Sequence, residues 1–334
     1  MSSAYRDTVA GAIGAVTLLS PTSFAWFGRP VGVLPADVEQ AMDADSARAY
    51  LLHALQLQLY GDCYCRGRAG PSDDHGGRGL ARRPESFIET LAEANTGTGS
   101  REPGWHVVSS SEEQLVVQRN GLSLWIAPGD VVERADEDLR PGAHVHVRLP
   151  NELRKLSPGF YMVLGDAGFE TEQPTPILRF YWHLASDTAP RLVHALTLRL
   201  NKARLQFRAK VVNDPARYTR CDAGVLYVHR DDYEAVAPMV RATYRQLAGG
   251  LRPATPAFAK RLAPGLAVAE DPGDGDSFGM HRVRLLAEGI VDAHERGLAD
   301  VAAAIGAVAD RFARAGLDLD APYVNAGSPD RYAL

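Results

Sequence analysis

The sequence contains few cysteines: Cys63, Cys65 and Cys221 are the only three among 334 residues. An odd and sparse set argues against a disulfide framework and favours a reducing compartment. Cys63 and Cys65 are too close together to form a zinc pair, and no further Cys or His stands at a suitable spacing. We therefore predict three small, buried thiols.

The sequence also lacks an apolar run of 18 residues, so no membrane-spanning helix is predicted. Residues 8–19 faintly resemble a signal peptide, but Asp7 stands beside the single Arg6 and no small-residue cleavage site follows promptly. We predict an amphipathic helix there and a cytoplasmic protein. The net charge of −5 gives no sign of bulk nucleic-acid or membrane binding.

Motifs for nucleotides and metals are missing as well. The chain has no Walker loop, dinucleotide fingerprint, zinc-protease motif or kinase signature, so we expect no cofactor and no metal. His144 and His146 share one face of a predicted strand, but no third ligand stands nearby, and an exposed polar face is the favoured interpretation. The acidic residues between 271 and 276 do not follow the spacing of a calcium-binding loop.

Lysine is scarce, since it occurs only at Lys155, Lys202, Lys210 and Lys260, and the other 32 of the 36 basic residues are arginines. An arginine bias can arise from high-GC coding alone. A lysine in such a chain is nevertheless a candidate for an individual role.

The apolar pattern predicts an α+β fold with a mixed, mostly antiparallel sheet flanked by helices. Apolar residues recur at helical spacing in the first part of the chain and alternate after residue 100, where Asn120-Gly121 is a strong hairpin signal. The predicted helices cover residues 4–18, 36–60 and about 84–95, and predicted strands fill residues 105–165.

The change near residue 100 gives the predicted domain organisation. Residues 1–98 form a helical N-terminal region, and residues 99–334 form a catalytic domain. Within the first, residues 66–85 are rich in Gly and Arg and lack periodicity, which predicts a loop.

Reactive side chains gather in the stretch from Leu178 to Tyr233, which is predicted as strand, helix, strand, turn and strand. Arg179 and His183 alternate with apolar residues in its first strand, and Arg208 and Lys210 alternate with apolar residues in its second. A sheet with one apolar face and one basic face favours an anion site.

The last third of the chain is predicted to contain a helix from Asp231, a Pro/Gly-rich connection over residues 252–279, and two further helices. Ser277 is the expected N-cap of the first of these two. It also stands in a Gly-x-Ser-x-Gly pattern, which in serine hydrolases follows a strand. Because an acidic turn precedes it here, a glycine-rich N-cap loop is the favoured interpretation, and a hydrolase using Ser277 is the weaker alternative.

A set of cations and one tyrosine forms the candidate site. Arginine forks bind phosphate through two hydrogen bonds, and helix N-termini add backbone donors, so this set suits a phosphorylated substrate. Salt bridges to the many Asp and Glu residues explain the same arginines equally well. The members are Arg179, His183, Arg208, Lys210, Arg220, Tyr227, Lys260, His281, Arg282 and Arg284.

Several long motifs resemble the HopA-type effector-like family: RFYWHL, LTLRLNKARLQFRAKV, YTRCDAGVLYV, TPAFAKRLAPGLAVAEDP and SFGMHRVRLLAEG, in this order. GLSLWIAPGD and PGFYMVLGDA upstream are also similar, so the resemblance covers roughly residues 100–295. It implies a phosphoserine/phosphothreonine lyase of class V lanthipeptide or thioamitide biosynthesis. Such an enzyme eliminates phosphate from a ribosomally made precursor peptide and leaves dehydroalanine or dehydrobutyrine.

The resemblance also implies roles and partners. Lys210 is the expected base or enolate stabiliser, His183 the expected acid, and Tyr227 a positioning hydroxyl. The partners would be the phosphorylated precursor peptide and the kinase that phosphorylates it, in a stable complex or apart, without nucleic acid or membrane. The phosphate would be bound by Arg179, Arg208, Arg220, Lys260, Arg282 and Arg284.

The sequence departs from related phosphothreonine lyases, whose first strand carries a Lys-x-His pair. Here that strand contains Arg179, Tyr181 and His183, so the histidine is displaced by two residues and the lysine is absent. Asn151 likewise stands where a lysine is common in the family. A non-catalytic phosphopeptide-binding scaffold that works with a peptide kinase is therefore the alternative function.

Overall fold

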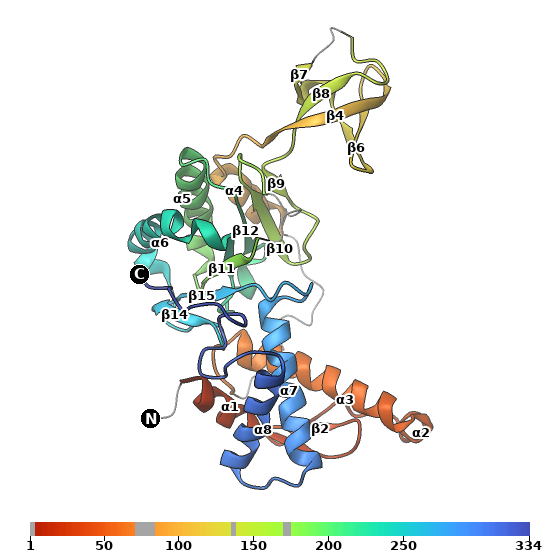
Figure 1. Cartoon of the computed structure of the whole chain (residues 1–334), viewed down its shortest axis with the longest axis vertical. Helices are drawn as coiled ribbons and strands as arrows, with labels where there is room; N and C mark the ends of the chain where they lie inside the picture. Colours follow the sequence, from red (N-terminus) through yellow and green to blue (C-terminus); the bar gives the residue numbers. More distant parts are fainter. Residues whose placement is uncertain (1–3, 71–83, 135–137, 170–174) are drawn as a thin grey trace.

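The computed structural model describes residues 4–70, 84–134, 138–169 and 175–334. Its elements form three tiers along the longest axis (Figure 1): a five-stranded sheet at one end, a seven-stranded sheet with helices in the middle, and a helical tier at the other end. The paired strands are antiparallel throughout these two sheets. The predicted α+β class is therefore confirmed.

The seven-stranded sheet has the order β14-β15-β11-β13-β12-β10-β9. Its core is the predicted unit of strand, helix, strand, turn and strand, which corresponds to β11, α5, β12 and β13. The strands are β9 (Glu152–Leu153), β10 (Phe160–Leu164), β11 (Ile177–Trp182), β12 (Phe207–Val212), β13 (Gly224–His229), β14 (Lys260–Ala263) and β15 (Leu266–Glu270).

One strand pair lies where the sequence predicts only a connection. Residues 252–279 include β14 and β15, which form a hairpin that turns at Gly265 with φ +76°. β15 also pairs with β11 along its length and is buried at all five positions. The predicted connection is therefore part of the seven-stranded sheet.

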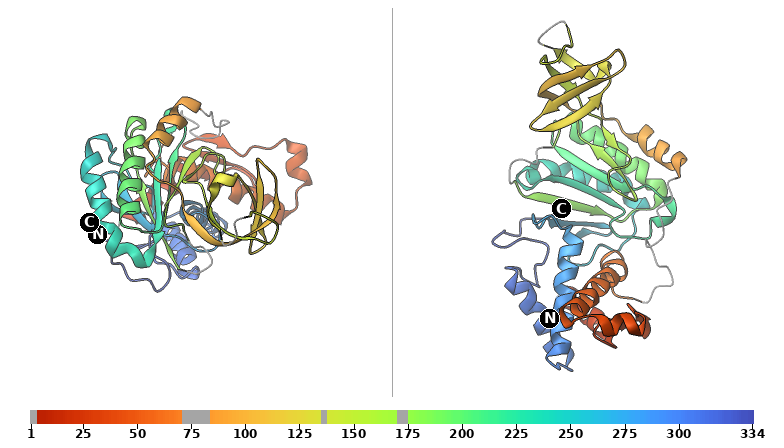
Figure 2. Two further views of the ribbon diagram at one scale, coloured as in Figure 1. Left: turned by 90° about the horizontal axis from the view of Figure 1, so that it is seen from above. Right: turned by 90° about the vertical axis from the view of Figure 1, so that its right-hand side faces the viewer.

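Helices α5 (Ala189–Lys202) and α6 (Tyr233–Leu247) cover one face of this sheet (Figure 2). The ring of Phe180 on β11 stacks on Tyr233 of α6 at 6.4 Å. A Cβ atom on Gly224 would lie 2.8 Å from Leu192 of α5, so only glycine permits this approach of helix and strand. The side chains that alternate with Phe180 consequently point to the other face.

The helical tier contains helices from the first and the last part of the chain. Helix α1 (Ala4–Ala15) packs against α8 (Val301–Arg314), and α3 (Ala44–Leu59) packs against α7 (Phe278–Glu295). These helices contribute to the same hydrophobic core as the seven-stranded sheet. The N-terminal helices thus do not form a core separate from the rest, although the sequence suggests a boundary near residue 98.

The five-stranded sheet has a core of its own, which includes Trp105, Val117 and Val147. Asn120 and Gly121 form its predicted hairpin turn with φ values of 49° and 80°. The sheet has the order β6-β5-β4-β8-β7. The strands are β4 (Arg101–Ser110), β5 (Leu115–Arg119), β6 (Leu122–Ile126), β7 (Val131–Arg134) and β8 (His144–Arg148).

The remaining elements are short. The helix predicted over residues 4–18 ends at Ala15, where β1 (Val16–Leu18), β2 (Phe24–Trp26) and β3 (Arg29–Val31) form a small sheet. The helix predicted over 36–60 is divided into α2 (Ala36–Ala41) and α3, and a π-helical turn, Tyr60–Tyr64, follows. Helix α4 spans Glu85–Ala94. Single 3₁₀ turns lie at Pro128–Asp130, Ser186–Thr188, Pro215–Arg217, Arg230–Asp232 and Ala248–Gly250.

Residues 71–83 of the predicted Gly/Arg-rich loop lie outside the described residues. Within the described part of the chain, no helix combines the length and apolar character needed to cross a membrane. The same residues contain no group of three or more His, Cys, Asp or Glu side chains that could hold a metal ion.

Candidate functional site

The strand registers place the basic side chains of β11 and β12 on one face of the sheet. Tyr227 on β13 stands opposite Arg179 on β11 and opposite Arg208 on β12. Lys210 lies two residues from Arg208 along β12, opposite Val225. Since directly paired residues of antiparallel strands share a face, these four side chains point away from α5 and α6.

Aromatic rings link these cations into a continuous group. The Tyr227 ring centre lies 5.3 Å from Arg179 Cζ and 5.9 Å from Lys210 Nζ. The Phe160 ring centre lies 4.3 Å from Lys210 Nζ and 5.4 Å from Arg220 Cζ. Such cation–π contacts orient a charged group without neutralising it. We use the name cationic face for Arg179, Arg208, Lys210 and Arg220 together with Tyr227 and Phe160.

Two arginines of the cationic face are held by carboxylates at its ends. Arg179 Nε donates to Asp271 Oδ2 at 2.7 Å, and Arg220 donates to both oxygens of Asp222 at 2.5 and 2.8 Å. Burial acts to raise the pKa of Asp222, but the Arg220 guanidinium outweighs it and holds that pKa below its usual range. Asp222 is therefore a charged anchor, and Arg220 is fixed in position.

The two cations between these anchors have no such partner within the described residues. Lys210 contacts the Phe160 and Tyr227 rings, and Arg208 lies over Phe169 at 4.3 Å. Burial lowers the pKa of Arg208, and the Arg179 charge acts in the same direction. Asp222 lies close enough to Lys210, and Asp271 close enough to Arg208, for their charges to act on each other, but neither carboxylate bonds these cations directly. The middle of the cationic face therefore has cations free to bond an anion.

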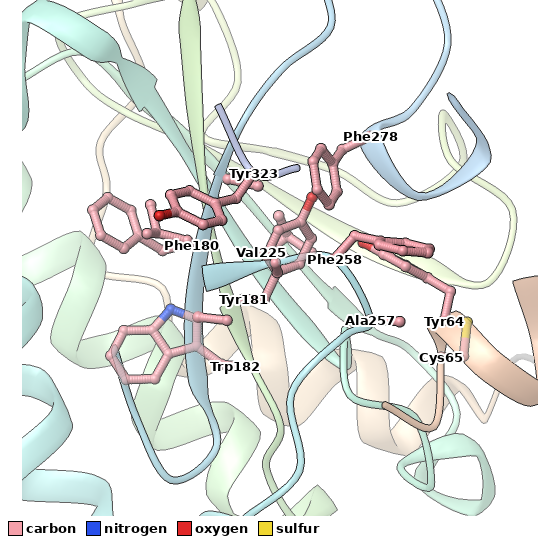
Figure 3. Packing of buried hydrophobic residues seen from close by; sticks show 14 of the residues in the cluster. Tyr64, Cys65, Phe180, Tyr181, Trp182, Val225, Ala257, Phe258, Phe278 and Tyr323 are labelled. Carbon is pink, nitrogen blue, oxygen red and sulfur yellow. The ribbon is translucent and has the colours of Figure 1, made fainter. Parts of the chain in front are cut away.

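Tyr181 is a further polar group on the same face, two residues after Arg179. It is 2% exposed and packs against Tyr64 and Phe278, with ring centres 6.4 and 6.2 Å apart (Figure 3). Its hydroxyl interacts with the hydroxyl of Tyr64, and the two affect each other's pKa. Tyr181 therefore links the polar face of β11 to the π-helical turn Tyr60–Tyr64. The alternation of β11 places it on the polar face, but its burial by distant elements is not visible in the sequence.

Arg282 does not belong to the cationic face but is linked to it through hydrogen bonds. It is fully buried on α7 and donates to Pro322 O at 2.7 Å and to Asn325 Oδ1 at 3.2 Å, while its Nη1 lies 2.8 Å from His281 Nδ1. Burial lowers its pKa to about 10. Asn325 in turn donates to the carbonyl of Asp271, the partner of Arg179. Arg282 thus braces the segment that holds one end of the cationic face.

The other predicted site residues do not join these contacts. His183 is 6% exposed, its Nδ1 lies 3.1 Å from Ala254 O, and burial lowers its pKa. Lys260 pairs with Val268, which places it on the face of Phe180, and its amine bonds Asp330 at 2.6 and 2.7 Å. Arg284 lies on α7, where its Nη1 is 3.4 Å from Glu288 Oε1. The structure thus brings Arg179, Arg208, Lys210, Arg220 and Tyr227 together and places Lys260 and Arg284 elsewhere.

Ser277 has the place that its N-cap role predicts. Its hydroxyl accepts a hydrogen bond from Met280 N at 3.3 Å at the start of α7, and an irregular segment, residues 271–276, precedes it. The arrangement is that of a helix cap, without the strand that a nucleophile elbow requires.

The chain has similarities to known proteins. The solved structures similar to it include two effector proteins from Pseudomonas syringae. That of pathovar tomato strain DC3000 has a TM-score of 0.49 and 16% identity, over 97% of this chain and 99% of the other. That of pathovar syringae strain 61 has a TM-score of 0.43 and 17% identity, over 80% and 88%.

None of the curated proteins matches the chain. The sequence profile of the HopA1 effector protein family matches residues 152–324. These residues contain all of the seven-stranded sheet and the two C-terminal helices, α7 and α8. This match extends over more than half of the sequence, and the chain therefore belongs to the HopA1 effector protein family.

Proposed function

We propose that the cationic face binds the phosphate of a phosphoserine or phosphothreonine side chain and that the protein eliminates this phosphate. The observation that carries the proposal is the position of Lys210. Its amine lies between two arginines that are fixed by carboxylates, and it has no carboxylate partner of its own among the described residues. A phosphate dianion would supply a direct ionic partner.

The proposed reaction is a β-elimination. Lys210 first gives its own proton to solvent, and the free amine then takes the proton from Cα. The electron pair of that C–H bond forms the Cα–Cβ double bond, and the Cβ–O bond breaks. The phosphate leaves with the electrons of that bond, so the products are a dehydroamino acid and inorganic phosphate. The arginines stabilise the charge that develops on the phosphate oxygens.

Two further residues have proposed roles in this reaction. Tyr227 lies between Arg179 and Lys210 and would position the phosphorylated side chain. His183 lies outside the contacts of the cationic face and is the proposed acid. Because a neutral imidazole that donates from Nδ1 to Ala254 O has no proton on Nε2, it would first take up a proton at the buried Nε2, which has no hydrogen-bond partner in the part of the chain described, and then give it to the departing phosphate. As part of the same proposal, the substrate is a precursor peptide of lanthipeptide type, phosphorylated by a peptide kinase in the cytoplasm.

The test is to incubate the protein with a phosphoserine peptide and to follow the mass of the peptide. Loss of phosphoric acid is expected for the unchanged protein, and Lys210→Ala should abolish it. Lys202→Ala, at an exposed lysine at the end of α5, is the matched control and should retain full activity.

The second candidate is a phosphopeptide-binding scaffold, which the absence of a lysine on β11 favours. It predicts that the peptide binds and that its mass does not change. A hydrolase would instead label Ser277 with a fluorophosphonate probe. Its hydroxyl already caps α7, so no labelling is expected.

A further inference from the structure

A pocket of about 470 Å³ lies next to the cationic face. It is formed by the end of α3, the π-helical turn after it, β3 and the turn before Arg220. Six of its residues matter to the argument: Tyr50, Ala54, Leu57, Tyr60, Arg217 and Arg220. It is a separate cavity from the middle of the cationic face, since neither Lys210 nor Tyr227 lines it.

The walls of this pocket are suited to an apolar side chain. Tyr50, Ala54 and Leu57 form the α3 side, and Leu57 is 42% exposed although it is a large apolar residue. A cavity lined by apolar and aromatic side chains together with a few polar groups is typical of a binding site. Arg217, Arg220 and Asp62 line the pocket as well.

The pocket and the cationic face are continuous through two residues. Arg220 lines the pocket, bonds Tyr60 there at 3.3 Å, and also lies over the Phe160 ring. Arg217 lies against Gly159, the residue before Phe160, since a Cβ atom on Gly159 would be 2.7 Å from its Nη1. A ligand that reaches Lys210 would therefore have the pocket beside it.

The distance fits a peptide. Lys210 Nζ and Arg220 Cζ lie 4.3 and 5.4 Å from the same ring centre. They are thus within about 10 Å of each other, and an extended chain advances about 3.3–3.6 Å per residue. A side chain within three positions of the phosphorylated residue could reach the pocket.

We infer that this pocket is a specificity subsite that takes an aromatic or large aliphatic side chain of the substrate peptide, within three residues of its phosphorylated residue. This inference rests on the proposed function, and it adds a requirement on the sequence of the peptide. Arg220 lies between the two sites, and its carboxylate partner Asp222, which is buried, holds it there.

The experiment uses phosphoserine peptides that differ at one position. Phe replaces Ala in turn at each of the three positions on either side of the phosphoserine, and kcat/KM for phosphate release is measured with the full chain. For one of these positions we expect an increase of about tenfold or more, the effect of burying a large apolar side chain. Peptide affinity, measured by fluorescence anisotropy, should change by the same factor.

Two variants alter the pocket from the α3 side. Leu57→Asp places a charge in its wall and Ala54→Trp fills it, and both should reduce the preference for Phe to about one. Leu198→Asp is the matched control, because Leu198 is a similarly exposed leucine, on α5 and away from the pocket. It should leave the preference intact.

Equal rates and equal affinities for the whole peptide set would overturn the subsite while leaving the proposed function standing. A preference that survives both pocket variants would also overturn it, since the side chain would then bind elsewhere. If no phosphopeptide binds or loses phosphate, the proposed function fails first and the subsite fails with it.

Discussion

At the scale of single residues, charge and hydrogen-bonding chemistry separate Lys210 from its neighbours. Arg179 and Arg220 are fixed by Asp271 and Asp222, whereas Lys210 contacts only aromatic rings among the residues described. An arginine at this position would keep the positive charge, but it stays protonated and is a poor base. Binding and elimination can therefore be separated by one substitution.

We expect Lys210→Arg to bind a phosphoserine peptide with an affinity close to that of the unchanged protein. Phosphate release should fall by about 10²–10⁴-fold, the usual contribution of a general base. Calorimetry and a phosphate-release assay measure the two properties, with Lys202→Arg as the control. Full turnover by Lys210→Arg would rule out Lys210 as the base.

His183 links burial to a pH dependence of stability. Burial lowers the pKa of this imidazole in the folded protein, so the unfolded chain, with a pKa of about 6.5, takes up the proton first. The contribution of His183 to the stability is fully present above that value and is lost as the pH falls toward the lower pKa of the folded protein. The urea midpoint of unfolding should therefore decrease from about pH 7 to pH 5.5, where an unperturbed histidine becomes protonated.

His183→Gln should reduce this decrease, because the amide can still donate to Ala254 O but does not titrate in this range. His281, whose pKa burial also lowers, would account for what remains. His144→Gln, at an exposed position on β8, is the control and should not alter the pH dependence. An unchanged slope in His183→Gln would contradict the assignment.

At the scale of elements, the sequence predicts alternating strands well and predicts their partners poorly. The period of two in residues 178–183 and 207–212 places Arg179, Arg208 and Lys210 on a polar face, and the registers agree. β15 escapes prediction because LAVAE is short, has no polar alternation and lies between Pro/Gly-rich segments. The burial of Arg282 and Tyr181 depends on contacts with residues far away in the sequence, which periodicity does not encode.

Helix packing provides a test at this scale. Gly289 of α7 lies against α8, where a Cβ atom would be 2.6 Å from the backbone of Val308, whereas one on Gly306 of α8 would meet nothing within 4 Å. Alanine favours helices over glycine by about 1 kcal/mol at either position. Gly306→Ala should therefore raise the free energy of unfolding, by about 0.5–1 kcal/mol.

Gly289→Ala should lower the free energy of unfolding by about 1–3 kcal/mol, because the added methyl group must push two helices apart. Urea denaturation of both variants measures the difference. If the two alanines stabilised the protein equally, α7 and α8 would not be in the close contact described.

At the scale of the whole molecule, helices from the first and the last part of the chain pack together in the helical tier, far from the five-stranded sheet, while the C-terminus itself lies beside α6 (Figure 1). The apolar pattern changes from helical spacing to alternation near residue 100, where strands replace helices along the chain. It does not show that α1 and α3 find their packing partners in α8 and α7. Sequence periodicity reveals an apolar helix face, and only the tertiary structure reveals what covers it.

The shared core predicts that damage in α1 is transmitted to α8. Val9 is fully buried, and Val9→Asp would place a charge among apolar side chains, at a cost of about 3 kcal/mol or more. Amide hydrogen exchange should then accelerate in α8, about as much as in α1 itself. Gly14→Asp, at an exposed position of the same helix where a Cβ atom would meet nothing within 4 Å, is the control and should leave both helices protected. Were residues 1–98 a self-contained unit, Val9→Asp would speed exchange in α1 and leave α8 unchanged, because only a shared core lets the two helices lose their protection together.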